Sequence, residues 1–170
     1  MRFRDLILPI SLAVSFFGAE GLRAEVAWDR LLERIRSEFP NVPSIGILEL
    51  RATRSADTLL VDVREPEEVA VSRLPGARAT QRIEDVRAWL AHGKYQRVVV
   101  YCSVGYRSAR FASALQRAGV ANVLNLEGSI FAWVNAGHPV ENALGPTTLV
   151  HPYDANWSRY LRPEHRAPLR

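Results

Sequence analysis

The chain has 170 residues, a formal net charge of +4 and a single cysteine. One cysteine excludes an internal disulfide and leaves the thiol free to react. The basic side chains are interleaved with acidic ones along the chain, and this pattern argues against a nucleic-acid-binding surface.

The first expected element is an apolar segment at residues 6–17, which Arg2 and Arg4 precede. This layout is typical of a secretory signal peptide, and we expect it to end near Ala24. The segment is short for a membrane span. An uncleaved membrane anchor and an N-terminal core helix are the alternatives. We therefore expect residues 1–24 to direct export, to the periplasm of a bacterium.

An amphipathic lead-in helix is expected at residues 25–42, where apolar and charged residues alternate up to Pro40. Beyond it, short apolar runs alternate with helical patterns. The expected strands lie at residues 43–45, 58–63, 98–101 and 123–126, and residues 75–79 are expected to form a turn into a further short strand. The expected helices lie at residues 46–52, 65–71, 83–90, 109–118 and 130–136. Strands that alternate with helices predict an α/β fold with a mostly parallel sheet and helices on both of its faces.

From residue 142 onward the chain is rich in proline and polar residues. We expect residues 142–170 to form an irregular arm, partly ordered, that docks on the domain through aromatic side chains such as Trp157 and Tyr160. The four histidines are scattered, and none has metal-ligand spacing to another or to the cysteine. The sequence therefore predicts no metal site and no cofactor.

The cysteine, Cys102, lies where a predicted strand ends and a helix begins. Residues 98–101 read as a buried strand, Gly105 allows a tight turn, and the helical pattern that follows stops at Gly119. Backbone N–H groups at a helix start carry partial positive charge, and a thiol beside them ionises more readily. The sequence therefore predicts a reactive thiolate inside an anion-binding loop. The alternative is that Cys102 is a small buried hydrophobe.

Four motifs, taken together, resemble those of the rhodanese-like domain family. LLVDVREPEEV at residues 59–69 resembles the family's first signature, and RLPGA at residues 73–77 resembles its Pro-Gly-Ala turn. YCSVGYRS at residues 101–108 resembles its active-site loop, and NLEGSIFAW at residues 125–133 resembles its closing segment. The motifs come in family order at family spacing, so the resemblance implies one rhodanese-like domain over residues 43–141 with a five-stranded sheet.

Two positions depart from the family pattern. Arg73 stands where a histidine is usual, and Ser129 stands where a second glycine is usual. Both lie outside the cysteine loop in sequence, so we expect them to change only the local packing.

The resemblance implies a sulfurtransferase that carries sulfur on Cys102 as a persulfide. A donor such as thiosulfate would supply a sulfane sulfur, and a thiol or cyanide would accept it; an acceptor protein is a further, unnamed partner. The loop whose backbone N–H groups would bind this sulfur comprises Ser103, Val104, Gly105, Tyr106, Arg107 and Ser108.

The side chains of this loop have separate expected roles. Those at positions 103, 104 and 106 are expected at the entrance of the site. Arg107 either holds an oxyanion or braces the loop, and Ser108 is expected to cap the following helix.

The resemblance also implies an architectural pair, Asp62 with Arg64. Glu127 is likewise expected to be a buried partner of an arginine such as Arg64, because a buried charge needs a partner.

Two other functions stay open. A non-catalytic binding module is one alternative, although such modules commonly lack the cysteine that this chain keeps. A cysteine-dependent phosphatase or arsenate reductase is the other. Relatives of that class with this fold have five residues between the cysteine and the arginine, whereas four separate Cys102 from Arg107. The smaller loop suits a sulfur atom better than a tetrahedral oxyanion.

Overall fold

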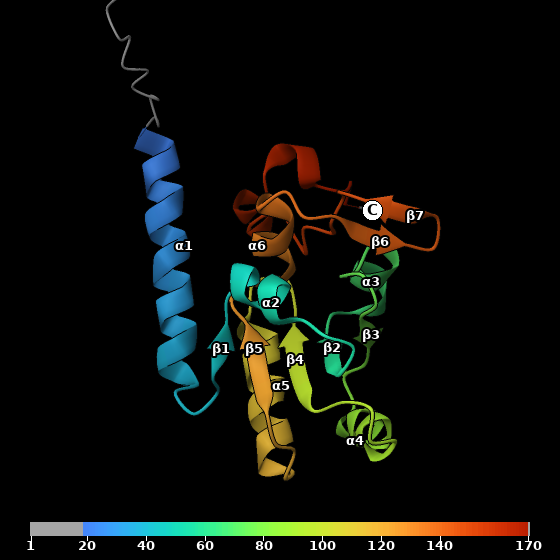
Figure 1. The fold of residues 1–170 in the computed structure, drawn as a ribbon. Coiled ribbons are helices and arrows are strands. Elements are labelled where there is room, and N and C mark those ends of the chain that lie inside the picture. The colour runs from blue at the N-terminus through green and yellow to red at the C-terminus, as the bar shows by residue number, and fades with distance from the viewer. Residues whose placement is uncertain (1–18, 170) are drawn as a thin grey trace, which may run out of the picture.

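Five parallel strands form the central sheet in the computed structural model, which describes residues 19–169 (Figure 1). The strands are β1 (Ser44–Ile45), β2 (Thr58–Asp62), β3 (Arg78–Ala79), β4 (Arg97–Tyr101) and β5 (Val123–Leu126). They lie side by side in the order β1-β5-β4-β2-β3, and each neighbouring pair is parallel. The predicted five-stranded parallel sheet is confirmed.

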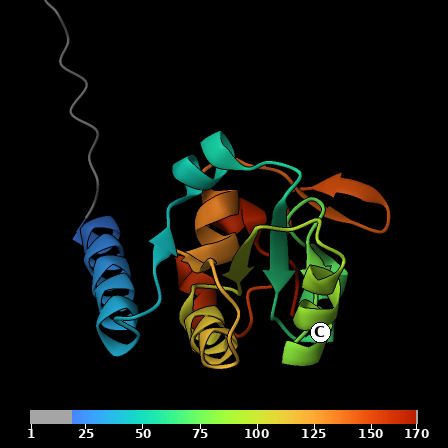
Figure 2. The same ribbon diagram turned by 60° about the horizontal axis from the view of Figure 1, so that its bottom comes forward.

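Helices pack on both faces of this sheet, as Figure 2 shows from a second direction. The helices between and after the strands are α2 (Ile47–Thr53), α3 (Pro66–Val71), α4 (Ile83–Ala91), α5 (Tyr106–Arg117) and α6 (Ser129–Asn135). Val86 of α4 and Leu115 of α5 belong to the core on one face. Leu50 of α2 and Phe131 of α6 belong to the core on the other. The predicted α/β fold with helices on both faces is therefore confirmed.

The middle strand, β4, is buried along both faces, which is why its sequence is almost uniformly apolar. Val98 and Val100 point into the core with α4 and α5, while Val99 and Tyr101 point into the core with α2 and α6. Cys102 follows the last residue of this strand. The cysteine therefore lies at the carboxyl edge of the sheet, where sites of open α/β sheets form.

A long helix, α1 (Ala19–Glu38), precedes the sheet and lies beside its β1 edge (Figure 1). It ends before the prolines that follow, and it begins earlier than the helix predicted at residues 25–42. The ring of Trp28 lies 5.3 Å from that of Tyr160 near the other end of the chain. No helix within residues 19–169 is long and apolar enough to cross a membrane. Residues 1–18 of the predicted export signal lie outside the described residues.

The C-terminal segment is more regular than predicted. It contains a hairpin of β6 (Val140–Asn142) with β7 (Gly145–Thr147), then two 3-10 helices, η1 (Trp157–Tyr160) and η2 (Pro163–His165). Val150 and Leu161 are buried in the core on the face of the sheet that α2 and α6 cover, which is the main core of the protein. Within residues 142–169 the expected arm therefore contains short regular elements, and its Trp157 and Tyr160 side chains pack against this core.

Candidate active site

The loop from β4 into α5 turns at Gly105. The φ angle of Gly105 is +114°, a conformation that strains any other residue. A Cβ there would lie 3.5 Å from Nδ2 of the Asn125 side chain. The Gly105 N–H donates a hydrogen bond to Sγ of Cys102 at 3.2 Å. The Asn125 side chain in turn donates to the Gly105 carbonyl oxygen at 3.1 Å. The loop is thus fixed with a backbone donor aimed at the sulfur.

Cys102 is only 1% exposed, and two opposing influences act on its thiol. Burial raises the pKa, because it disfavours the charged thiolate. The positive charge of Arg107 and hydrogen bonds from Ser108 and Gly105 together outweigh burial and leave the pKa below that of an ordinary cysteine. The thiolate is the nucleophilic form, so this environment favours nucleophilic chemistry.

Ser108 does not cap the helix as predicted. Gly105 occupies the cap position, and Ser108 lies within the first turn of α5. Its Oγ lies 2.6 Å from Oδ1 of Asn125 and 3.5 Å from Sγ of Cys102. A buried hydroxyl needs partners, and here the loop cysteine and the β5 asparagine supply them.

Arg107 braces the loop through a buried glutamate. Its guanidinium donates to both carboxylate oxygens of Glu68 at 2.7 and 2.8 Å, and it donates to Oγ of Ser103 at 2.9 Å. The Ser103 hydroxyl donates to Glu68 at 2.7 Å. Burial raises the pKa of Glu68, but the contacts with Arg107 outweigh this and lower it. The carboxylate stays ionised and ties α3 to the cysteine loop.

Sequence reasoning did not find Glu68. The signal that it leaves in the sequence is a capping box: Glu68 accepts a hydrogen bond from the Glu65 N–H at 3.0 Å, as the third residue of α3. That pattern predicts a helix start but not a contact with a loop 39 positions away.

Asp62 and Arg64 form the architectural pair that the resemblance implied. The Arg64 guanidinium donates to Asp62 at 2.7 and 2.9 Å, and both side chains are fully buried. Arg64 also donates to the Ser72 carbonyl oxygen at 2.5 Å, while the Tyr101 hydroxyl donates to Asp62 at 2.8 Å. Burial lowers the pKa of Arg64, but Asp62 outweighs it and the net direction is upward. The pair locks the ends of β2 and β4 together.

Glu127 does not contact Arg64 as predicted. It pairs instead with Arg36 on α1, and its side chain is 30% exposed. The reason is topological: Glu127 follows β5, whereas Arg64 follows β2 on the far side of β4. Glu127 therefore attaches the lead-in helix and does not complete the buried pair.

Ser129 touches the cysteine directly, which corrects the expectation that it changes only the local packing. Its Oγ accepts a hydrogen bond from the Cys102 N–H at 3.1 Å and donates to the Leu126 carbonyl oxygen at 3.1 Å. Its φ is +50°, in the left-handed region that favours glycine. The other departure, Arg73, pairs with Glu141 at 3.6 Å, away from the cysteine.

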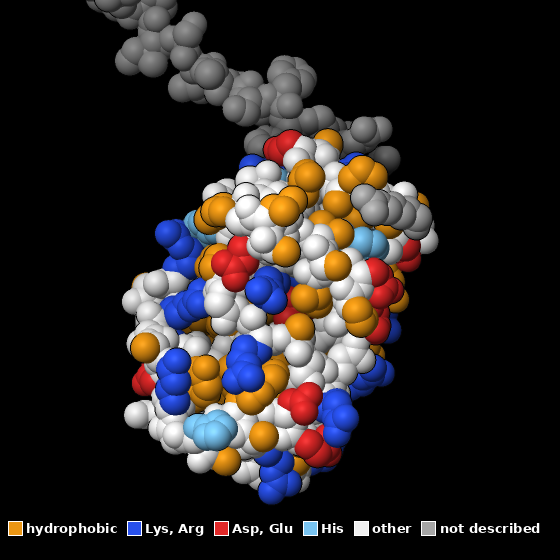
Figure 3. Space-filling view, turned by 90° about the vertical axis from the view of Figure 1, so that its right-hand side faces the viewer, with side chains coloured by type: hydrophobic (Ala, Val, Ile, Leu, Met, Phe, Trp, Pro, Cys, Tyr) orange, Lys and Arg blue, Asp and Glu red, His pale blue; other side chains and the backbone are white. Residues whose placement is uncertain are grey.

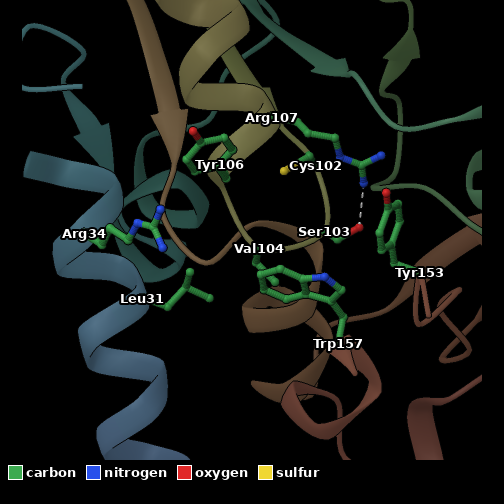
Figure 4. Close-up of a pocket in the computed structure, with 9 residues that line it drawn as sticks. All are labelled: Leu31, Arg34, Cys102, Ser103, Val104, Tyr106, Arg107, Tyr153 and Trp157. Atoms are coloured by element: carbon green, nitrogen blue, oxygen red, sulfur yellow. Dashed lines mark hydrogen bonds between the residues drawn. The ribbon is translucent and has the colours of Figure 1, made fainter. Parts of the chain in front are cut away.

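A pocket of about 290 Å³ opens above the thiol (Figure 4). From the loop and the start of α5 it is lined by Cys102, Ser103, Val104, Tyr106 and Arg107. The positions expected at the entrance thus all face this cavity. Four further residues were not predicted: Leu31 and Arg34 on α1, and Tyr153 and Trp157 near the C-terminus.

The described part of the chain shows no concentration of one charge on the face drawn in Figure 3 and no cluster of metal-binding side chains. On the face seen in Figure 3, basic side chains are mixed with acidic and hydrophobic ones and form no stripe. Within residues 19–169, no three His, Cys, Asp or Glu side chains lie close enough together to hold a metal ion.

The chain is similar to known proteins over the segment that carries this site. A sequence model of the rhodanese-like domain matches residues 47–136. A sulfurtransferase of Allochromatium vinosum is 36% identical over 94 residues, which are 55% of this chain and 87% of that protein. The thiosulfate sulfurtransferase GlpE of Pseudomonas putida is 30% identical over 110 residues, which are 64% of this chain and 96% of that protein.

Solved structures share the fold. A thiosulfate sulfurtransferase from Pseudomonas aeruginosa superimposes with a TM-score of 0.56 at 24% identity, over 79% of this chain and 26% of that one. A Rhodopseudomonas palustris protein described as a possible tyrosine phosphatase gives a TM-score of 0.52 at 24% identity, over 67% of this chain and 93% of that one. At these identities the likeness concerns the fold alone.

Proposed function

The chain belongs to the rhodanese-like domain family, and we propose that it is a sulfurtransferase that carries a sulfane sulfur on Cys102. The observation that carries the proposal is the thiol itself: its pKa is lowered against the effect of burial, and it lies at the base of an open pocket. Such a thiol is equipped for nucleophilic attack, not for packing.

Thiosulfate illustrates the two steps. The Cys102 thiolate attacks the outer sulfur of thiosulfate, the sulfur–sulfur bond of the donor breaks, and its electron pair leaves with sulfite. The enzyme then holds a persulfide anion, which the Gly105 N–H is placed to stabilise. Cyanide or a thiolate next attacks the outer sulfur, and the bond to Sγ breaks to restore the thiolate.

The state of Arg107 favours this function over phosphate or arsenate chemistry. In a site for a tetrahedral oxyanion, an arginine fork binds the oxygens of the substrate directly. Here both ends of the fork are engaged by Glu68. Together with the four-residue spacing between Cys102 and Arg107, this supports a loop that surrounds one sulfur atom. The intact cysteine loop, in turn, disfavours a non-catalytic binding module.

The test is turnover of thiosulfate and cyanide to thiocyanate, beside hydrolysis of a phosphate ester, for the wild type and for Cys102→Ser. We expect the wild type to turn over thiosulfate only, and we expect the serine variant, which is nearly the same size, to fold with no turnover. Phosphatase activity without sulfur transfer would move the chain to the rival class. Turnover by the serine variant would remove Cys102 from the mechanism.

We also propose that the chain is exported to the periplasm of a bacterium. The basic start and the apolar run at residues 6–17 support this proposal. Cleavage near Ala24 would keep Leu31 and Arg34, so the pocket lining would survive processing. N-terminal sequencing of protein made in a bacterial host should begin near Glu25 or Leu22. An intact Met1 on cytoplasmic protein would contradict the proposal.

A further inference from the structure

The pocket above Cys102 has a second wall that lies outside the family segment at residues 47–136. In Figure 4, Leu31 and Arg34 project from α1 on one side, while Tyr153 and Trp157 come from the C-terminal segment on the other. The family fold supplies the reactive sulfur, and the appended segments supply much of the surface that a substrate meets.

Several contacts fix α1 against the domain. Glu127 pairs with Arg36, and the Tyr106 hydroxyl donates to Glu38. The ring of Phe39 also meets that of Tyr106 edge to face, at 5.5 Å between centroids. The wall on this side is therefore part of the folded structure.

The C-terminal side is fixed in the same way. Trp157 packs against the main core, and its ring lies 5.8 Å from that of Tyr160. The Tyr160 carbonyl oxygen accepts a hydrogen bond from the Asn135 side chain on α6 at 2.8 Å. The guanidinium carbon of Arg107 lies 4.9 Å from the centre of the Tyr153 ring, so this wall reaches the active-site loop itself.

The cavity is larger than thiosulfate needs. A small ion such as thiosulfate would fill only part of a cavity of about 290 Å³. Leu31, Val104 and Trp157 present apolar surface to that space. Apolar lining with a few placed polar groups is typical of a pocket for an organic ligand.

Arg34 supplies a charge at the outer part of this wall. Its contact with Glu38 is long, at 3.9 Å, and its side chain is 76% exposed, so the guanidinium can turn to a ligand. Arg107, by contrast, is held by Glu68. The wall thus combines an apolar middle with a cation on its α1 side, away from Tyr153 and Trp157 (Figure 4).

Building on the proposed function, we propose that the sulfur donor is an organic anion with an apolar body and a carboxylate. The apolar body would lie against Leu31 and Trp157, and the carboxylate would meet Arg34. Leu31, Arg34 and Trp157 then determine specificity, and they do so from segments that the family domain does not include.

Aryl thiosulfonates are suitable probes, since they carry a sulfane sulfur on an apolar ring. The Cys102 thiolate attacks the outer sulfur, the bond between this sulfur and the sulfonyl sulfur breaks, and the electron pair leaves with the aryl sulfinate. Cyanide then removes the outer sulfur as thiocyanate and restores the thiolate.

The first experiment compares kcat/KM for methanethiosulfonate, benzenethiosulfonate and 4-carboxybenzenethiosulfonate, with cyanide as acceptor. We expect the phenyl ring to raise kcat/KM about tenfold over the methyl group, because an apolar pocket gains this much from a modest apolar group. We expect the carboxylate to add about threefold, as an exposed ion pair does, and the gain to fade at high salt. Equal values for all three donors would overturn the proposal.

Variants test whether Arg34, Trp157 and Leu31 cause these differences in kcat/KM between donors. Arg34→Gln should abolish the gain from the carboxylate, whereas Arg30→Gln, an exposed arginine on the same helix outside the pocket lining, should keep it. Trp157→Leu should reduce the gain from the phenyl ring, with a thermal melt to confirm folding. If Trp157→Leu lowers the melting temperature, Leu31→Ala replaces it as the test of the gain from the phenyl ring. Unchanged donor ratios in folded variants would contradict the assignment.

Failure of this inference is distinguishable from failure of the proposed function. If thiosulfate places a sulfur on Cys102 in the wild type but the three organic donors do not differ, only the substrate class is wrong. If no donor places a sulfur on Cys102, the sulfurtransferase function itself fails.

Discussion

Replacing Glu68 with glutamine tests whether the buried carboxylate holds the active-site loop. Glu68 is 1% exposed and receives hydrogen bonds from Arg107, Ser103 and the Glu65 N–H. Glutamine keeps the shape but turns an N–H group toward donors and removes the charge. Breaking a buried ion pair costs about 3–5 kcal/mol, and the lower end applies because Arg107 is 23% exposed and can turn to water.

A loss of about 3 kcal/mol lowers the melting temperature by roughly 6–12 °C in a domain of this size. The loop would also loosen, and a displacement of order 1 Å at a reacting group can cost ~10²-fold in rate. The assays are a thermal melt and thiosulfate turnover. Glu67→Gln, an exposed neighbour on the same helix, is the matched control and should change neither.

The acid dependence gives a second check on Glu68. Its pKa is lowered in the folded protein, so its contribution is fully present above the ordinary glutamate pKa of about 4.3 and is lost as pH falls through the lowered value. The stability gap between the wild type and Glu68→Gln should therefore narrow below about pH 4.3. A variant that melts with the wild type at neutral pH and keeps full turnover would refute the reasoning.

Three other predictions concern neighbouring groups. Arg64→Ala should cost about 3–5 kcal/mol in a thermal melt, because Asp62 stays buried without its partner; an unchanged melt with lost turnover would reverse its assigned role. Ser129→Ala should destabilise the protein by about 1 kcal/mol more than Ser129→Gly in denaturant unfolding, since only glycine relieves the positive φ; the opposite order would refute this. Thiolate absorbance of Cys102, corrected with Cys102→Ser, should titrate with a midpoint below that of a cysteine in an unstructured peptide, and Ser108→Ala should raise it; a midpoint above that of the peptide would contradict the assigned environment.

The strand, loop and helix around Cys102 could be predicted from the sequence because local signals define them. The apolar run of β4 and the helical spacing of α5 act over a few residues, and Gly105 marks the turn between them. Local signals of this kind need no knowledge of the tertiary structure. The pairing of Asp62 with Arg64 was instead implied by the resemblance to the rhodanese-like domain family.

The remaining parts of the site depend on contacts between distant segments. Glu68 reaches Arg107 across 39 positions, and Glu127 meets Arg36 across 91 positions. An exposed charge and a buried one look alike in a sequence, so neither contact left a signal there. The pocket walls at Leu31 and Trp157 come from opposite ends of the chain and were hidden for the same reason.

The most direct test of the central claim is the mass of the intact protein after brief exposure to thiosulfate without an acceptor. The account predicts that the wild type gains the mass of one sulfur atom, that peptide mapping places it on Cys102, and that cyanide removes it as thiocyanate. Cys102→Ser should gain nothing. A wild-type protein that stays unmodified by thiosulfate and by the organic donors would contradict the account.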